Sequence, residues 1–145
     1  KGAVSTSVQC RALSVEDGQK KHMKARSFKD LVVWQKAMEL VGEIYSLTGR
    51  LPKTETYILS SQMLRAAISI PSNIAEGYRR SHKQEFLQFL AIAIGSAGEL
   101  ETQVIIAKKQ YPQLDYRKID GLLDEIQRIL YVFIKKLKEN QTVGV

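Results

Sequence analysis

The sequence predicts an all-α protein, an antiparallel up-and-down four-helix bundle with a kinked second helix. Four segments place apolar residues at the three- and four-residue spacing of an amphipathic helix. The connections between these segments are short, which makes consecutive helices antiparallel neighbours. No segment shows strand alternation with a tight-turn signal. We therefore expect one bundle domain at residues 27–140, with a flexible tail at 1–26 and a short tail at 141–145.

The amino-acid composition favours a globular protein of one domain and argues against a membrane, secreted or zinc-binding protein. The chain has 145 residues, of which 44% are hydrophobic, enough for one domain with a real core. No apolar run approaches the roughly 20 residues that cross a bilayer, and residues 1–20 lack a secretory signal's apolar core. The single cysteine, Cys10, fits a reducing compartment. We expect a cytoplasmic protein with no membrane contact, metal or cofactor, since two histidines and one cysteine make a zinc site improbable.

The net charge of +7 is unevenly distributed. Residues 1–26 carry more than half of it, so the bundle itself is only mildly basic. Met23 leaves two alternatives open for this tail. Either residues 1–22 are native, or the natural chain begins at Met23 and the preceding residues were added to it.

The first predicted helix begins near Asp30, whose carboxylate can accept from the exposed N–H groups of the first turn. Gly49 and Pro52 end it. Its expected core stripe is Trp34, Ala37, Met38, Val41, Ile44 and Tyr45. Further apolar residues, including Val33, Leu40 and Leu47, extend beyond one face. They indicate either an interface with a second subunit or deeper burial in the bundle.

The second predicted helix has Thr54 as its N-cap and ends soon after Gly77. Its expected core stripe is Leu59, Met63, Ala66, Ala67, Ile70 and Ile74. Pro71 lies inside this stripe. Because proline lacks an N–H group and crowds the preceding turn, we predict a kink between Ala67 and Pro71.

The third helix is predicted to start at a capping box made by Ser81 and Gln84. Its expected core residues are Phe86, Leu87, Leu90, Ala93, Ile94, Ala97, Leu100, Val104 and Ile105. Gly95 and Gly98 lie in its middle. Because glycine costs a helix about 1 kcal/mol relative to alanine, the pair predicts close approach by another helix.

The fourth helix follows Tyr111 and Pro112, with Asp115 as its cap. Its predicted core residues are Ile119, Leu122, Leu123, Ile126, Leu130, Phe133 and Leu137.

Three stretches carry a family resemblance: FKDLVVWQKAMELV at 28–41, SQMLRAAISIPSNIAEGYRR at 61–80 and EFLQFLAIAIGSAGELETQ at 85–103. They closely resemble four-helix-bundle proteins encoded in intervening sequences of bacterial 23S ribosomal RNA genes. The resemblance spans about 28–139, and SIPSNIAEG at 69–77 is its most specific part.

The resemblance implies a four-helix bundle without established catalytic activity, often assembled as a ring-like homopentamer. A related branch contains the accessory variability proteins of diversity-generating retroelements. Those are basic pentamers that partner a reverse transcriptase and nucleic acid. The mildly basic bundle of this chain departs from that branch.

One end of the predicted bundle gathers basic residues from several segments. The candidate phosphate-binding residues are Arg79, Arg80, Lys83, Lys135, Lys136 and Lys138. The alternative is an ordinary solvated face, because lysines near a helix C-terminus also favour the helix dipole. Tyr78 and His82 flank the arginine pair and are candidates for stacking on a base, or simply surface residues.

The SIPSNIAEG stretch also permits two interpretations. Its notable residues are Ser69, Pro71, Ser72, Asn73, Glu76 and Gly77. In the functional interpretation, Ser72, Asn73 and Glu76 form a site beside the kink. In the structural one, which we favour, polar side chains satisfy carbonyls freed by the proline, and Glu76 pairs with a basic residue.

No catalytic constellation is present in the sequence. Glu99 and Glu101 are two residues apart, so they do not share a helix face. No Ser-His-Asp set and no phosphate-binding loop can be argued.

We therefore expect a non-catalytic homo-oligomer that associates with RNA or DNA through its basic end. The alternative is a protein-interaction scaffold, or an accessory subunit of a reverse transcriptase or another nucleic-acid enzyme.

Overall fold

Four long helices form the protein in a computed structural model that describes residues 25–139. They are α2 (Val32–Arg50), α3 (Ser61–Arg79), α4 (Lys83–Gln110) and α5 (Arg117–Glu139). A 3-10 turn, η1 (Phe28–Asp30), precedes α2, while a second one, η2 (Lys53–Glu55), and a π-helical turn, η3 (Thr56–Ser60), join α2 to α3. Within 25–139 there is no strand. The predicted all-α four-helix bundle is confirmed.

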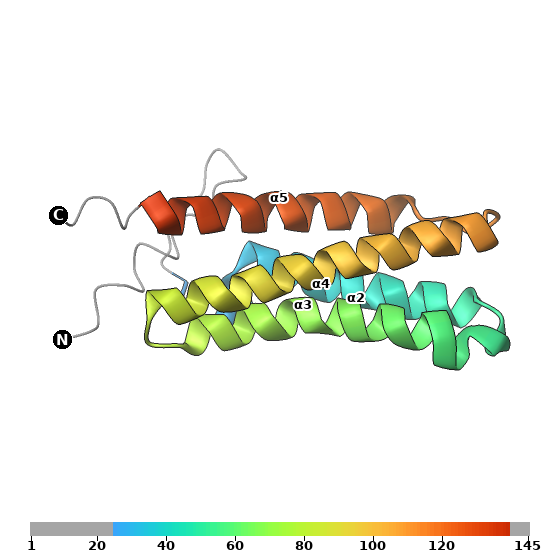
Figure 1. The fold of residues 1–145 in the computed structure, drawn as a ribbon, viewed down its shortest axis with the longest axis horizontal. Helices are drawn as coiled ribbons and strands as arrows, with labels where there is room; N and C mark the ends of the chain where they lie inside the picture. The colour runs from blue at the N-terminus through green and yellow to red at the C-terminus, as the bar shows by residue number, and fades with distance from the viewer. Residues whose placement is uncertain (1–24, 140–145) are drawn as a thin grey trace.

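The helices run up and down, and their connections alternate between two ends of the bundle (Figure 1). The start of α2, the α3–α4 turn and the end of α5 share one end. The α2–α3 and α4–α5 connections lie at the other end. Most of the predicted tail 1–26, with Cys10 and Met23, and all of the tail 141–145 lie outside the described residues.

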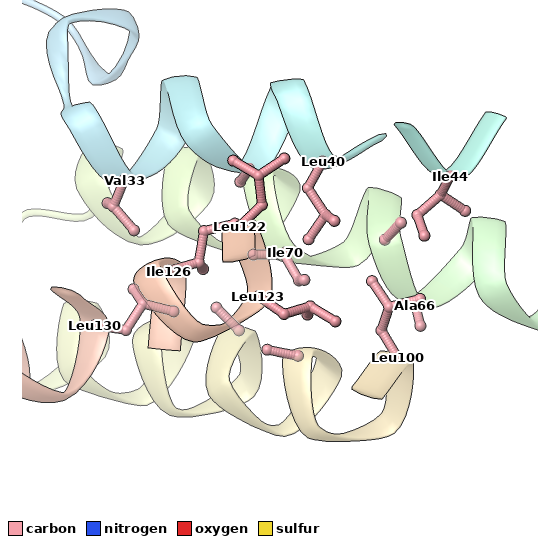
Figure 2. Packing of buried hydrophobic residues seen from close by; sticks show 14 of the residues in the cluster. Val33, Leu40, Ile44, Ala66, Ile70, Leu100, Leu122, Leu123, Ile126 and Leu130 are labelled. Carbon is pink, nitrogen blue, oxygen red and sulfur yellow. The ribbon is translucent and has the colours of Figure 1, made fainter. Parts of the chain in front are cut away.

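The core runs the length of the bundle and receives side chains from all four helices. Figure 2 shows Val33, Leu40, Ile44, Ala66, Ile70, Leu100, Leu122, Leu123, Ile126 and Leu130 converging between the helices. Every predicted core residue of α3 and α5 is buried. On α4 the prediction also holds, except that Ile94 is half-buried and Ile105 is 47% exposed.

The predicted stripe of α2 is partly wrong. The buried residues of this helix are Val33, Ala37, Leu40, Ile44 and Leu47. Met38 and Tyr45 are 44% and 56% exposed. Because α2 is apolar on two adjacent faces, its period alone does not identify which face meets the core.

Two of the predicted helix starts are wrong. Asp30 does not precede α2 as its cap. Ser27 caps η1, and the Asp30 carboxylate accepts from the Arg26 and Ser27 N–H groups at 2.9 and 3.2 Å. Thr54 is not the cap before α3, because the Glu55 carboxylate accepts from the Leu59 N–H at 3.4 Å.

The predicted capping box of α4 is also wrong. The helix begins at Lys83, after His82, which has an extended backbone and gives no side-chain cap. The prediction for α5 agrees with the structure, since the Asp115 carboxylate accepts from the Arg117 N–H at 3.0 Å.

The α3 helix is continuous from Ser61 to Arg79 and contains Pro71 (Figure 1). The proline leaves the Ala67 carbonyl without its usual amide donor. Nearby side chains bond the two following carbonyls instead. The Ser72 hydroxyl donates to Ile68 O at 2.8 Å, and the Asn73 amide donates to Ser69 O at 2.8 Å. The predicted bonding to a freed carbonyl is therefore wrong in detail, and the kink itself stays a prediction.

Glycines in α3 and α4 have opposite surroundings. A Cβ added at Gly77 would lie 2.8 Å from Phe86 Cδ2 and 2.8 Å from Phe89 Cβ. A Cβ added at Gly95 or Gly98 would meet nothing within 4 Å. The close helix approach predicted for Gly95 and Gly98 is thus absent within the described chain, and the close approach occurs at Gly77.

By length and composition alone, α4 could span a membrane. Buried positions make up 39% of its most apolar window. A core helix of a bundle meets the same criterion, so this is weak evidence for membrane insertion.

Candidate nucleic-acid interface

The basic end of the bundle brings together cationic residues from separate parts of the chain. We define the basic end by Arg26, Lys29, Arg79, Arg80, Lys83, Lys135, Lys136 and Lys138. All six predicted phosphate-binding residues belong to it. They lie on the α3–α4 turn and the last turns of α5, which share one end of the bundle (Figure 1). All eight side chains are exposed except Lys83, which is half-buried.

Arg80 is neutralised by two carboxylates. Its guanidinium lies 2.8 Å from Glu76 Oε1 and 3.9 Å from Glu85 Oε1. The same group lies over the Phe89 ring, 5.0 Å from the centroid. These contacts connect the last turn of α3 with the first turns of α4. Arg80 therefore braces the turn and is the least available of the predicted phosphate ligands.

Arg79 has different surroundings from its neighbour. Its guanidinium carbon lies 5.4 Å from the centroid of the Phe28 ring. Phe28 meets Trp34 edge-on, with ring centroids 5.4 Å apart. No ion pair joins Arg79 to any acid in the described part of the chain. Arg79 thus packs on an aromatic ring and has no acid partner among the described residues.

The lysines of the basic end are also without ion pairs to the acids that the structure describes. Three of the four carboxylates at this end are used elsewhere, and the fourth is Glu139, the last residue of α5. Asp30 binds backbone N–H groups, and Glu76 and Glu85 face Arg80. Lys136 and Lys138 lie in the last turn of α5, where cations also favour the helix dipole.

At the far end, ion pairs compensate three of the six basic residues. We define the far end by the basic residues Arg50, Lys53, Lys108, Lys109, Arg117 and Lys118. Lys108 Nζ lies 2.6 Å from Asp120, and Arg117 lies 2.8 Å from Asp115. Lys118 lies 2.7 Å from Glu43 and 3.3 Å from Glu39.

The titration behaviour of the far end follows from these pairs. Hydrogen bonds from Arg117 hold the pKa of the Asp115 carboxyl well below its usual range. The Glu43 and Glu39 carboxylates raise the pKa of Lys118. A hydrogen bond of 2.7 Å to Glu55 raises the pKa of the Tyr111 hydroxyl.

The SIPSNIAEG residues form contacts that favour the structural interpretation. The Ser69 and Ser96 hydroxyls are 2.8 Å apart and link α3 to α4. The Asn73 amide donates to the Ser69 hydroxyl at 2.9 Å. Glu76 pairs with Arg80, and Gly77 makes room for two phenylalanines. Each named residue of the motif therefore has a local packing or bonding role.

Two features were missed by sequence reasoning. The cation–ring stack of Arg79 on Phe28 joins residues far apart in the chain, so no local pattern predicts it. Gln103 is buried on α4, and its Oε1 has no hydrogen-bond partner among residues 25–139. Tyr78, considered for base stacking, donates to Ala25 O at 3.1 Å and meets Phe86 edge-on, while His82 is exposed.

The described residues contain no group of three or more His, Cys, Asp and Glu side chains that could hold a metal ion. Glu99 accepts from Gln103, and Glu101 accepts from Gln127, so the two carboxylates serve different contacts.

The fold and this interface define an all-α four-helix-bundle protein with a cationic end. A family model described as "23S rRNA-intervening sequence protein" matches residues 29–132, and the chain belongs to this family. The resemblance found in the sequence is thereby confirmed.

A solved structure is similar to this chain: a protein of unknown function from the S23 ribosomal protein family of Bacteroides thetaiotaomicron. It is 28% identical, with a TM-score of 0.66, and the alignment covers 72% of this chain and 96% of that one. No curated protein matches the chain.

Proposed function

We propose that this protein is a non-catalytic, homo-oligomeric bundle of the cytoplasm that associates with RNA or DNA through its basic end. The observation that carries the proposal is the difference in charge pairing along the bundle. At the basic end, Arg80 alone among the described cations has an ion pair to a described acid. Unpaired cations attract a phosphate backbone without first losing an internal partner.

Exposed apolar residues support self-assembly. Met38 and Tyr45 of α2 and Ile68 of α3 are 42–56% exposed. On α4, Ile92, Ile105 and Ile106 are 45–47% exposed, and the glycines beside them leave the helix surface open. Exposed apolar residues on different helices suit a heterologous interface, which forms a ring when the rotation between subunits closes. The homopentamer implied by the family resemblance is one such ring.

A ring also strengthens the nucleic-acid hypothesis. Every subunit of a cyclic assembly presents its basic end to the same side, so several weak phosphate sites would act together.

The second candidate is a protein-interaction scaffold, or an accessory subunit of a reverse transcriptase or another nucleic-acid enzyme. The same exposed residues of α2, α3 and α4 favour it, because an apolar surface also suits a different protein. Its binding would change little with salt, whereas phosphate binding weakens as salt rises.

The test compares two triple charge reversals in the full chain by fluorescence anisotropy with labelled RNA and DNA over a salt series. One variant is Arg79→Glu/Lys83→Glu/Lys136→Glu at the basic end. Its control is Arg50→Glu/Lys53→Glu/Lys109→Glu at the far end, where these three cations also lack ion pairs to described acids. Both variants keep residues 1–24 and change the net charge equally.

We expect the basic-end variant to lose roughly 100-fold in affinity and its salt slope to fall by about three. The control should keep most of its binding. Equal losses in both variants would indicate attraction by bulk charge. No binding by the wild type would overturn the proposal and favour a protein partner.

A further inference from the structure

Arg79 and Phe28 form a supported cation at the basic end, although 51 positions separate them in the chain. The Phe28 ring is fixed from the other direction by the edge of Trp34, with an interplanar angle of 66°. Both rings are half-buried and pack against the core. The guanidinium is therefore held over a rigid ring, and it loses less conformational freedom on binding than a free side chain would.

The adjacent arginine provides an internal comparison. Arg80 also lies over a phenylalanine ring, but Glu76 and Glu85 occupy its donors. Arg79 has no ion pair and no side-chain hydrogen bond within the described residues. Arg79 is exposed, and its ring contact with Phe28 leaves its N–H groups without a hydrogen-bond acceptor among the described residues.

We propose that Arg79, supported by Phe28, is a stacking position for an unpaired nucleobase. The ligand of the basic end would then be single-stranded or looped nucleic acid. This inference rests on the proposed function and deepens it by naming the form of nucleic acid.

Two physical arguments carry the choice of an unpaired base. Guanidinium planes stack on splayed bases in single-stranded RNA, whereas bases inside a duplex are already stacked on each other. In addition, the basic end is built from a 3-10 turn, the α3–α4 turn and a helix terminus. It presents neither the side of a helix nor a β-ribbon of the kind that enters a major groove.

Trp34 supplies a reporter at this position, because it is the only tryptophan and it contacts Phe28. The probes are a single-stranded RNA of roughly 12 nucleotides, an abasic strand of the same length, and a blunt duplex. The abasic strand has the same phosphates without bases. Trp34 fluorescence reports binding at the stack, and anisotropy of labelled probes reports total binding.

The deciding variant is Arg79→Lys, which keeps the charge and removes the planar group. Its control is Arg128→Lys, the same change on the exposed surface of α5, where Arg128 pairs with Asp124. Phe28→Leu is a second variant, which removes the supporting ring and keeps Arg79. Circular dichroism checks that each variant is folded.

We expect the wild type to bind the RNA roughly tenfold more tightly than the abasic strand, with a change in Trp34 fluorescence. Arg79→Lys and Phe28→Leu should remove most of this preference and leave abasic binding nearly unchanged. Equal binding of the RNA and the abasic strand, or no effect of Arg79→Lys, overturns the stacking position while leaving the basic-end proposal intact. Wild type that binds none of the probes overturns both.

Discussion

The far end and the basic end of the bundle differ in how many of their basic residues form ion pairs. At the far end, Lys108, Arg117 and Lys118 each have a carboxylate partner within 3.3 Å. At the basic end, Asp30 serves the backbone and Glu76 and Glu85 serve Arg80, and the other described cations have no acid partner among the described residues. Overall net charge does not reveal this difference, because both ends contain many basic residues. Within the described chain, three of the six far-end cations have an acid partner, against one of the eight basic-end cations, so the fraction of paired cations distinguishes the two surfaces more than the number of charges does.

The largest expected effect on stability comes from Gly77, where α3 and α4 pack closely near the basic end. In Gly77→Ala, the new Cβ would lie 2.8 Å from Phe86 and Phe89, so the α3–α4 packing must shift. Overpacking costs about 1–3 kcal/mol, which outweighs the gain of about 1 kcal/mol in helix propensity. We expect a net loss of about 1–2 kcal/mol in the free energy of unfolding, measured by urea denaturation.

Gly121→Ala is the matched control on α5, where an added Cβ meets nothing within 4 Å. It should stabilise the protein by about 0.5–1 kcal/mol through helix propensity alone. If both substitutions stabilise the protein, then Gly77 is not the close contact that positions the α3–α4 turn.

A smaller effect is expected in the pH dependence of stability, through Asp115 at the far end. The folded pKa of Asp115 lies below its unfolded value, so the carboxylate contributes stability at neutral pH. This contribution is lost as the pH falls below the ordinary carboxyl range, about 3.9, toward the folded pKa. Asp115→Asn should therefore melt at a lower temperature than wild type near neutral pH, and the difference should shrink on acidification.

Asp124→Asn is the comparison for that prediction, since Asp124 pairs with an exposed arginine on its own helix. Thermal melts followed by circular dichroism across the pH range provide the measurement. A difference between Asp115→Asn and wild type that stays constant with pH would show that the ion pair with Arg117 is not its source.

Sequence patterns predicted the helices far better than their contacts. The single apolar faces of α3 and α5 identified their core residues correctly, because each helix has one face to bury. On α2, a second apolar face led to the wrong assignment of Met38 and Tyr45. The predicted caps of α2 and α3 failed because turns of 3-10 or π type precede these helices, and the predicted cap of α4 failed although that helix follows an extended residue, His82.

At the candidate site, too, the sequence predicted the position of the residues better than their contacts. Topology placed all six predicted basic residues at one end, because alternating helices bring the α3–α4 turn beside the end of α5. The ion pairs of these residues could not be predicted from the sequence. Arg79 and Arg80 are adjacent and chemically identical, yet only Arg80, whose extended backbone follows the end of α3, contacts Glu76 and Glu85. Such differences depend on side-chain direction, which composition and spacing do not contain.

The smallest effect compares one lysine from each end. Lys118 bridges α5 to Glu39 and Glu43 on α2, so Lys118→Met should lower the melting temperature slightly. Lys136 has no ion pair to a described acid, and its favourable interaction with the helix dipole is opposed by repulsion from the other cations of the basic end, so Lys136→Met should change the melting temperature less than Lys118→Met. Added salt screens both interactions, so the two melting temperatures should converge as salt rises. Equal responses of the two variants at low salt would mean that pairing does not distinguish the ends in solution.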